Sequence, residues 1–170
     1  MKLLRFTKSF ITIAVWLVLI SGCMQKEIVK VDLDTYLKNQ QQYKGEQFKD
    51  KKLVITSTLK DVNERYDLYK GKIIELSAPV TYYGKSLFWT WYITLQKDGF
   101  KLRCYEDHYR LYPDRLAVDA ALKARKSGDE VTVRGKLYSD GLEMEWLIYD
   151  GYNIDTNNPT RFSYPFPVWH

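Results

Sequence analysis

The segment LFWTWYITLQKDGFKLRCYED, residues 87–107, decides the fold of this chain. It contains two runs rich in aromatic and β-branched residues, separated by Lys97-Asp98-Gly99. Aromatic and β-branched residues are enriched in strands, and Asp-Gly between two alternating runs is a strong signal for a tight hairpin. We therefore expect two antiparallel strands that turn at residues 97–99.

One face of this hairpin is apolar, because side chains of a strand alternate between the two faces of a sheet. The apolar set contains Trp89, Trp91, Ile93, Leu95, Phe100, Leu102 and Cys104. These side chains are expected to line a core, since an apolar face of this size has to be shielded from water. Cys104 is then a small buried hydrophobic residue and not a nucleophile.

The segments after residue 67 continue the β pattern and interrupt it with one helix. A long strand is predicted at 68–84, where Pro79 marks an edge or a bulge. A helix is predicted at 112–128, with Pro113 at its first position and Gly128 as its stop. A second hairpin is predicted at 129–151, turning at residues 139–141. The order is three strands, one helix and two strands.

Residues 32–67 contain two further elements. A short amphipathic helix is predicted at 32–45, with Asp32 or Asp34 as its N-cap and Gly45 as its stop. The alternating, β-branched run 51–59 is predicted to be a strand.

The phrases YKGKIIEL, KLRCY and GDEVTVRGKL resemble small exported bacterial OB-fold proteins, including the tRNA-anticodon-binding-like lipoprotein families. The resemblance spans about residues 68–150 and implies a mainly-β fold, a β-barrel with one main helix: an OB-fold-like five-stranded Greek-key barrel. Residues 32–67 would add an extra N-terminal helix and strand. Residues 151–170 end in the aromatic stretch RFSYPFPVWH, expected either to fold across the barrel or to dock a partner.

The amino-terminal residues have the pattern of an export signal. A basic start is followed by the apolar run FITIAVWLVLI at 10–20, which is too short to cross a membrane. LISGC, residues 19–23, resembles a bacterial lipobox. The resemblance implies cleavage after residue 22, acylation of Cys23, a tether at 23–31, and attachment of the exported protein to a bacterial membrane. In a Gram-negative host this would be the periplasmic side of the outer membrane.

Net charge argues against a nucleic-acid ligand. The chain has 26 basic and 21 acidic residues, a net charge of +5. Three of the basic residues and none of the acidic ones lie in residues 1–22, so the remaining chain has a net charge of +2. A nucleic-acid-binding domain is expected to keep a clear basic excess.

The outward side chains of the predicted sheet form the candidate ligand-binding site. They are basic and aromatic: Tyr92, Lys101, Arg103, Tyr105, Arg134 and Lys136. OB-folds use the face of their second and third strands for oligonucleotides and oligosaccharides. The competing interpretation is an ordinary solvated face, whose charges are offset by Glu75, Glu143 and Glu145.

Residues 104–108, CYEDH, contain residue types that could form a metal or thiol site. Cys104, Glu106 and His108 alternate along one run, but structural zinc usually needs two closely spaced ligand pairs, and the second histidine is the terminal His170. We predict no metal, no cofactor and no catalytic residue.

Two functions remain open for the exported domain. The favoured one is a non-catalytic binding or scaffolding module for an envelope protein or glycan. The alternative is a divergent thermonuclease-like OB-fold hydrolase, since SGDEVTVRG resembles thermonucleases. The resemblance fails at LSAPVTYYG, where no acidic residue precedes Ala78-Pro79. A hydrolase should have a concave cluster of acids and arginines.

Overall fold

A computed structural model describes residues 26–85, 91–106 and 115–155. Among these residues its elements, in chain order, are β1 (Glu27–Asp32), α2 (Leu33–Lys38), η2 (Gln42–Lys44), η3 (Glu46–Phe48), β2 (Lys51–Thr56), α3 (Leu59–Glu64), α4 (Tyr66–Tyr69), β3 (Ile73–Lys85), β4 (Trp91–Lys97), β5 (Phe100–Glu106), α5 (Arg115–Ser127), β6 (Glu130–Tyr138), β7 (Gly141–Tyr149) and β8 (Tyr152–Asp155).

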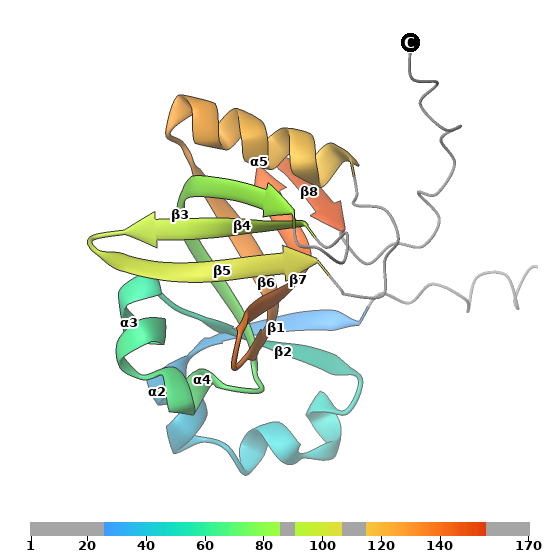
Figure 1. Cartoon of the computed structure of the whole chain (residues 1–170). Helices are drawn as coiled ribbons and strands as arrows, with labels where there is room; N and C mark the ends of the chain where they lie inside the picture. Colours follow the sequence, from blue (N-terminus) through green and yellow to red (C-terminus); the bar gives the residue numbers. More distant parts are fainter. Residues whose placement is uncertain (1–25, 86–90, 107–114, 156–170) are drawn as a thin grey trace, which may run out of the picture.

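Five strands close into a barrel (Figure 1). The long β3 pairs antiparallel with β6 through its first half and with β4 through its second half. β4 pairs with β5, β6 pairs with β7, and a short parallel pairing of β5 with β7 completes the circle. With α5 between the third and fourth barrel strands, this is the expected OB-fold arrangement. The predicted fold class is confirmed.

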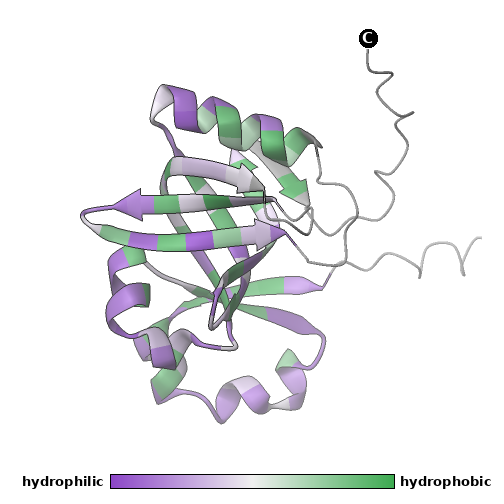
Figure 2. Cartoon of the chain, in the orientation of Figure 1, coloured by the Kyte–Doolittle hydropathy of each residue, from purple (hydrophilic) through white to green (hydrophobic). Residues whose placement is uncertain are grey.

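The hairpin β4–β5 forms as its sequence predicts. Lys97 pairs with Phe100 across a two-residue turn, in which Asp98 has φ 51° and Gly99 has φ 86°. Two positive φ angles characterise the type I′ turn, whose twist matches that of the strands. Hydropathy alternates along both strands (Figure 2), and Trp91 is 1% exposed. The predicted inward direction is confirmed for Trp91, while Trp89 lies outside the described residues.

α5 covers one end of the barrel and packs against β3 (Figure 1). The helix approaches closely because it presents three fully buried alanines, Ala117, Ala121 and Ala124. It ends at Gly128, which has φ 81° and donates its N–H to the Ala124 carbonyl at 2.8 Å. Gly128 is therefore the predicted αL stop. Pro113 lies outside the described residues.

The amino-terminal extension differs from its prediction. Residues 27–31, expected to belong to a tether, are part of β1, which pairs in parallel with β2 from Glu27↔Lys51 to Asp32↔Thr56. β2 then pairs with β3 through Ile55↔Ile74, so that β1 and β2 extend the barrel sheet. The helix predicted at 32–45 ends earlier, at Lys38, and two 3-10 turns follow.

An ion-pair triad joins β1 to the barrel. Glu75 on β3 accepts bonds from Lys30 Nζ of β1 at 2.5 Å and from Arg134 Nε and Nη2 of β6 at 2.8 and 2.6 Å. Arg134 is only 4% exposed. Burial by itself raises the pKa of Glu75, but the bonds from Lys30 and Arg134 outweigh it and hold that pKa below its ordinary value. The triad is therefore charged at neutral pH.

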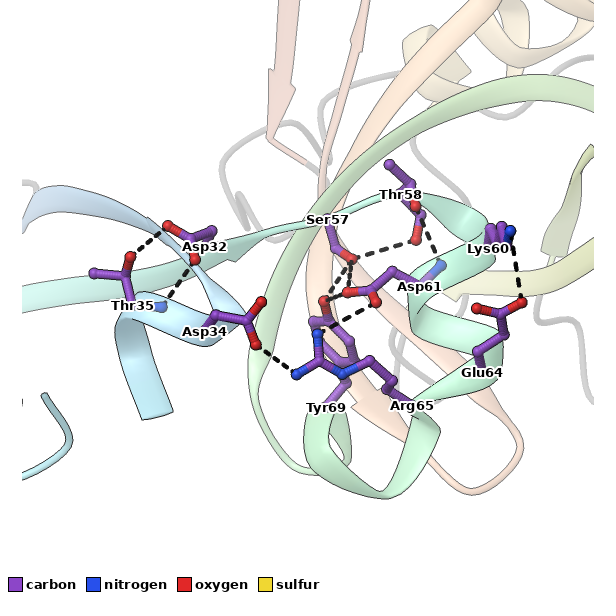
Figure 3. A network of polar contacts seen from close by, with 10 residues as sticks. All are labelled: Asp32, Asp34, Thr35, Ser57, Thr58, Lys60, Asp61, Glu64, Arg65 and Tyr69. Carbon is purple, nitrogen blue, oxygen red and sulfur yellow. Dashed lines mark hydrogen bonds and ion pairs between the residues drawn. The ribbon is translucent and has the colours of Figure 1, made fainter. Parts of the chain in front are cut away.

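A polar network fixes the short helices α3 and α4, which the sequence patterns did not predict (Figure 3). The buried Tyr69 hydroxyl donates to Asp61 and accepts from Ser57 Oγ at 2.7 Å. Arg65 reaches Asp34 of α2 at 2.7 Å and Asp61 at 3.4 Å. Burial, followed by the bond to Asp61, raises the pKa of Tyr69 to about 12. These contacts tie α2 to α3 and α4.

The segment predicted as a tail begins with a strand. β8 pairs antiparallel with β7, from Trp146↔Asp155 to Tyr149↔Tyr152. Residues 156–170 lie outside the described residues, so the role of the aromatic tail stays a prediction. Within the described ranges, no helix is both long and apolar enough to span a bilayer.

Candidate functional site

Three side chains form a stacked ladder on the outer face of β3, β4 and β5. The rings of Tyr82 and Tyr92 lie 5.7 Å apart between centroids, inclined by 30°. Arg103 places its guanidinium carbon 4.7 Å from the centroid of the Tyr92 ring. The neighbouring Tyr82 hydroxyl raises the pKa of the Tyr92 phenol above its ordinary value, so this ring is neutral at pH 7. The ladder thus combines two aromatic rings with one guanidinium group.

Tyr82 belongs to the ladder because of a β-bulge. Strict alternation from Val80, which is 3% exposed, would place Tyr82 in the core. The register of β3 against β4 shifts between Val80 and Tyr82, so that Thr81 is an extra residue. A bulge reverses the side-chain alternation beyond it. Tyr82 therefore points outward and is 49% exposed. Tyr83 turns inward, and the centroid of its ring lies 6.0 Å from that of Trp91.

Gly84 provides the space that the two tyrosine rings occupy. It lies opposite Tyr92 in the pairing of β3 with β4. A Cβ at this position would lie 2.6 Å from Cε1 of Tyr82 and 2.8 Å from Cζ and Oη of Tyr92. Any other residue would have to displace both rings. The glycine is thus a condition for the ladder.

An open concavity adjoins the ladder on the same three strands. Its lining is polar and cationic, consisting of Thr81, Tyr82, Thr94, Gln96, Lys101 and Arg103. Lys101 and Arg103 are both exposed. Among the described residues, no carboxylate belongs to this lining. Hydroxyl, amide and cationic groups next to a stacked ring can bind a ligand that carries hydroxyls and a negative charge.

The structure groups three of the six predicted site residues on one accessible face, and the other three are buried or lie on other strands. Tyr92, Lys101 and Arg103 share the outer face of β4 and β5. Arg134 does not belong to an exposed face, because the triad with Glu75 and Lys30 buries it.

Tyr105 and Lys136 are not part of the exposed ladder. Tyr105 lies opposite Tyr92 in the pairing of β4 with β5, but it is only 5% exposed. Its hydroxyl donates to Asp140 at 3.0 Å, and its burial raises its pKa. Lys136 is exposed and lies three strands from Tyr92, through the paired residues Tyr105 and Glu143, about 14 Å at about 4.8 Å per strand. Lys136 forms a separate pair with Tyr138, with Nζ 5.2 Å from the centroid of that ring.

The residues tested for metal or thiol chemistry are engaged in the core where they are described. Cys104 is fully buried, which raises the pKa of its thiol. Glu106 is 2% exposed and accepts the indole N–H of Trp91. Asp107 and His108 lie outside the described residues. Within the described ranges, no three His, Cys, Asp or Glu side chains gather in a way that could hold a metal.

Comparison with known proteins gives only distant structural similarities. Neither a protein-family model nor a curated protein matches the chain. Apo TiaS, a tRNA agmatidine synthetase, is 16% identical with a TM-score of 0.39 over 55% of this chain and 20% of its own. A deletion mutant of TiaS in complex with agmatine is 14% identical with a TM-score of 0.36 over 50% of this chain and 26% of its own. An OBody bound to hen egg-white lysozyme is 15% identical with a TM-score of 0.37 over 51% of this chain and 83% of its own.

The chain therefore spans a fifth to a quarter of the length of the TiaS chains that it matches. The assignment of an OB-fold rests on the strand pairing described above.

Proposed function

We propose that this chain is a membrane-anchored binding module of the bacterial envelope, whose ladder of Tyr82, Tyr92 and Arg103 binds a glycan that carries acidic groups. The observation that carries the proposal is the stacking of the exposed Tyr82, the half-exposed Tyr92 and the exposed Arg103, beside Lys101. Aromatic faces suit the apolar faces of sugar rings. Arginine and lysine suit carboxylates and phosphates.

The shape of the concavity supports a glycan over a protein ligand. Its lining offers the hydroxyls of Thr81 and Thr94 and the amide of Gln96 within one open surface. Such groups both donate and accept hydrogen bonds, as do sugar hydroxyls. A protein partner is the other outcome that the same experiment can reveal. The hydrolase alternative gains no support from this concavity, because the part of its lining that the structure describes contains no carboxylate.

The binding experiment uses a tyrosine–cation pair elsewhere on the barrel as its matched control. Purified acidic envelope glycan fragments are titrated into the protein by calorimetry. The double variant Tyr82→Ala/Arg103→Ala should weaken binding at least tenfold, since about 1.4 kcal/mol corresponds to a factor of ten and central contacts contribute about 2 kcal/mol or more. The control Lys136→Ala/Tyr138→Ala should bind as the natural protein does.

Equal losses in both double variants, or no binding of any acidic glycan, would contradict the proposal. Calorimetry with neutral fragments of the same length separates stacking from charge. If a crosslinked envelope protein is recovered through Tyr92 while every glycan fails to bind, the ligand is a protein.

The anchor is tested independently of the ligand. Cys23→Ala should move the protein from the membrane fraction to the soluble fraction, because two acyl chains are needed for stable attachment. Cys104→Ala is the matched control, since it removes the other thiol of the chain, which is buried. A Cys23→Ala protein that remains in the membrane fraction would show that the anchor is wrong.

A further inference from the structure

The strand β1 leaves very little chain between the predicted lipidation site and the folded domain. The sequence pattern suggested a tether at residues 23–31, which would allow Asp32 to lie about 30 Å from Cys23 at about 3.4 Å per residue. The structure instead begins its sheet at Glu27. Four residues of chain, at most about 14 Å when fully extended, then separate Cys23 from the sheet.

β1 has no slack that could lengthen this connection. Its register with β2 begins at its first residue, Glu27↔Lys51, and an ion pair of 3.1 Å joins the same two side chains. Further along, Lys30 binds the buried carboxylate of Glu75, which Arg134 also holds. Releasing β1 would remove Lys30 from the carboxylate of Glu75 and would expose the backbone hydrogen-bonding groups of β2.

The length of the connection decides how freely the domain can move. A domain of about 120 residues has a radius of gyration of about 14 Å. Headgroups account for about 5–7 Å of the connection on one side of a bilayer. A domain on so short a connection cannot turn over without its own body meeting the membrane.

We infer that the barrel lies directly against the bilayer surface with the amino end of β1 toward the lipid, so that its orientation is set by the anchor. The inference depends on the proposed acylation of Cys23. In Figure 1 the amino end of β1 lies on the same side of the molecule as the carboxyl ends of β3 and β5, opposite the turn between β4 and β5. Tyr82 and Arg103 both pair with Thr94, and Tyr92 lies two residues further toward that side, so Tyr92 is the ladder residue nearest to the membrane and a bound ligand lies close to the bilayer.

Electrostatic attraction is not the cause of this orientation. Three exposed or half-exposed charges of each sign lie at the amino end of β1 and in the residues that lead into β2: Lys26, Glu27, Glu46, Lys49, Asp50 and Lys51. They sum to zero, so anionic lipid gains no net attraction here. The orientation should therefore be the same on neutral and anionic vesicles and at low and high salt.

The test measures the proximity of two labelled positions to lipid. The full-length, acylated protein is reconstituted into phosphatidylcholine vesicles that contain a lipid with a nitroxide on its headgroup. A fluorophore is attached through Lys26→Cys, next to β1, or through Lys60→Cys on α3, which lies on the opposite side in Figure 1. Cys104 does not compete for the label because it is fully buried.

Quenching at position 26 should exceed quenching at position 60 at least fivefold, with and without anionic lipid. In a control protein, 16 Gly and Ser residues are inserted between Gln25 and Lys26, a linker of about 22 Å. There the ratio should fall below two. Vesicle binding with equal quenching at both positions in the natural-length protein would overturn the orientation and leave the anchor intact. Failure to bind vesicles would overturn the anchor and the orientation with it.

Discussion

Gly84→Ala is expected to destabilise this protein only as long as the two tyrosines beside it are present. The new Cβ would lie 2.6 Å from the Tyr82 ring and 2.8 Å from the Tyr92 ring. Both rings end flexible, outward side chains, so they would swing away while the strand stays in place. The variant would then lose a stacked ring pair of about 0.5–1.5 kcal/mol and a cation–π contact with Arg103 of about 0.5–1 kcal/mol.

The opposing effect comes from the unfolded chain. Gly84 has no positive φ, so alanine fits its backbone, and glycine-to-alanine at such a site stabilises by about 0.4–1 kcal/mol. We expect Gly84→Ala to lower the free energy of unfolding by about 1 kcal/mol in the natural protein. In the background Tyr82→Ala/Tyr92→Ala the same change should raise it by up to about 1 kcal/mol.

Urea unfolding measures this sign reversal in the natural protein and in the Tyr82→Ala/Tyr92→Ala background, each with and without Gly84→Ala. Gly135→Ala in the same two backgrounds is the control. A Cβ at Gly135 would lie 1.9 Å from the backbone oxygen of Glu143, so removing the tyrosines cannot relieve the clash. Gly135→Ala should therefore be destabilising to the same extent in both backgrounds. If Gly84→Ala lowers the free energy of unfolding by the same amount in both backgrounds, the two tyrosine rings do not occupy the space beside Gly84, and the description of the ladder is wrong.

Three further predictions concern the core and the triad. Glu75→Gln should destabilise the fold by about 3–5 kcal/mol in urea unfolding, because it leaves the charge of Arg134 buried without its carboxylate; a loss below 1 kcal/mol would show that water reaches this site. Folding lowers the pKa of Glu75, so the stability that its charge contributes is complete above the unfolded pKa of about 4.3 and is lost as pH falls through the lower folded pKa. Glu75→Gln should therefore flatten the acid limb of a plot of unfolding free energy against pH. An unchanged acid limb would contradict this. Tyr69→Phe should cost about 1–3 kcal/mol of unfolding free energy, because Asp61 loses a buried donor; a neutral effect would refute the network. Cys104 should react with a thiol reagent only at the rate of unfolding, in contrast to a fast-reacting exposed thiol introduced by Lys60→Cys.

Local chemistry explains why the barrel and its turns were predictable from the sequence. Asp98-Gly99 tolerates two positive φ angles, which few other dipeptides do. Gly128 ends α5 for the same reason. The alternation through Trp91, Ile93 and Leu95 identifies the core face of β4 without any knowledge of its neighbours. Each of these signals is contained in a few adjacent residues.

The candidate site was predictable only in part, because its composition depends on contacts between distant segments. Tyr92, Lys101 and Arg103 follow from alternation within one hairpin. Tyr82 does not, since a bulge reverses the alternation of β3, and neither does Arg134, whose burial requires strands from both ends of the chain.

The sequence of this protein by itself determined its barrel strands, its main helix and its two hairpin turns, since backbone conformation and strand alternation are set by neighbouring residues. Only the tertiary structure decided that β1 and β8 are strands, because each becomes regular by hydrogen bonding to a partner strand. It likewise decided which charges are buried and which tyrosines are exposed. Burial is a property of what packs on a residue, and Glu75, which binds the buried Arg134, lies 59 positions away along the chain.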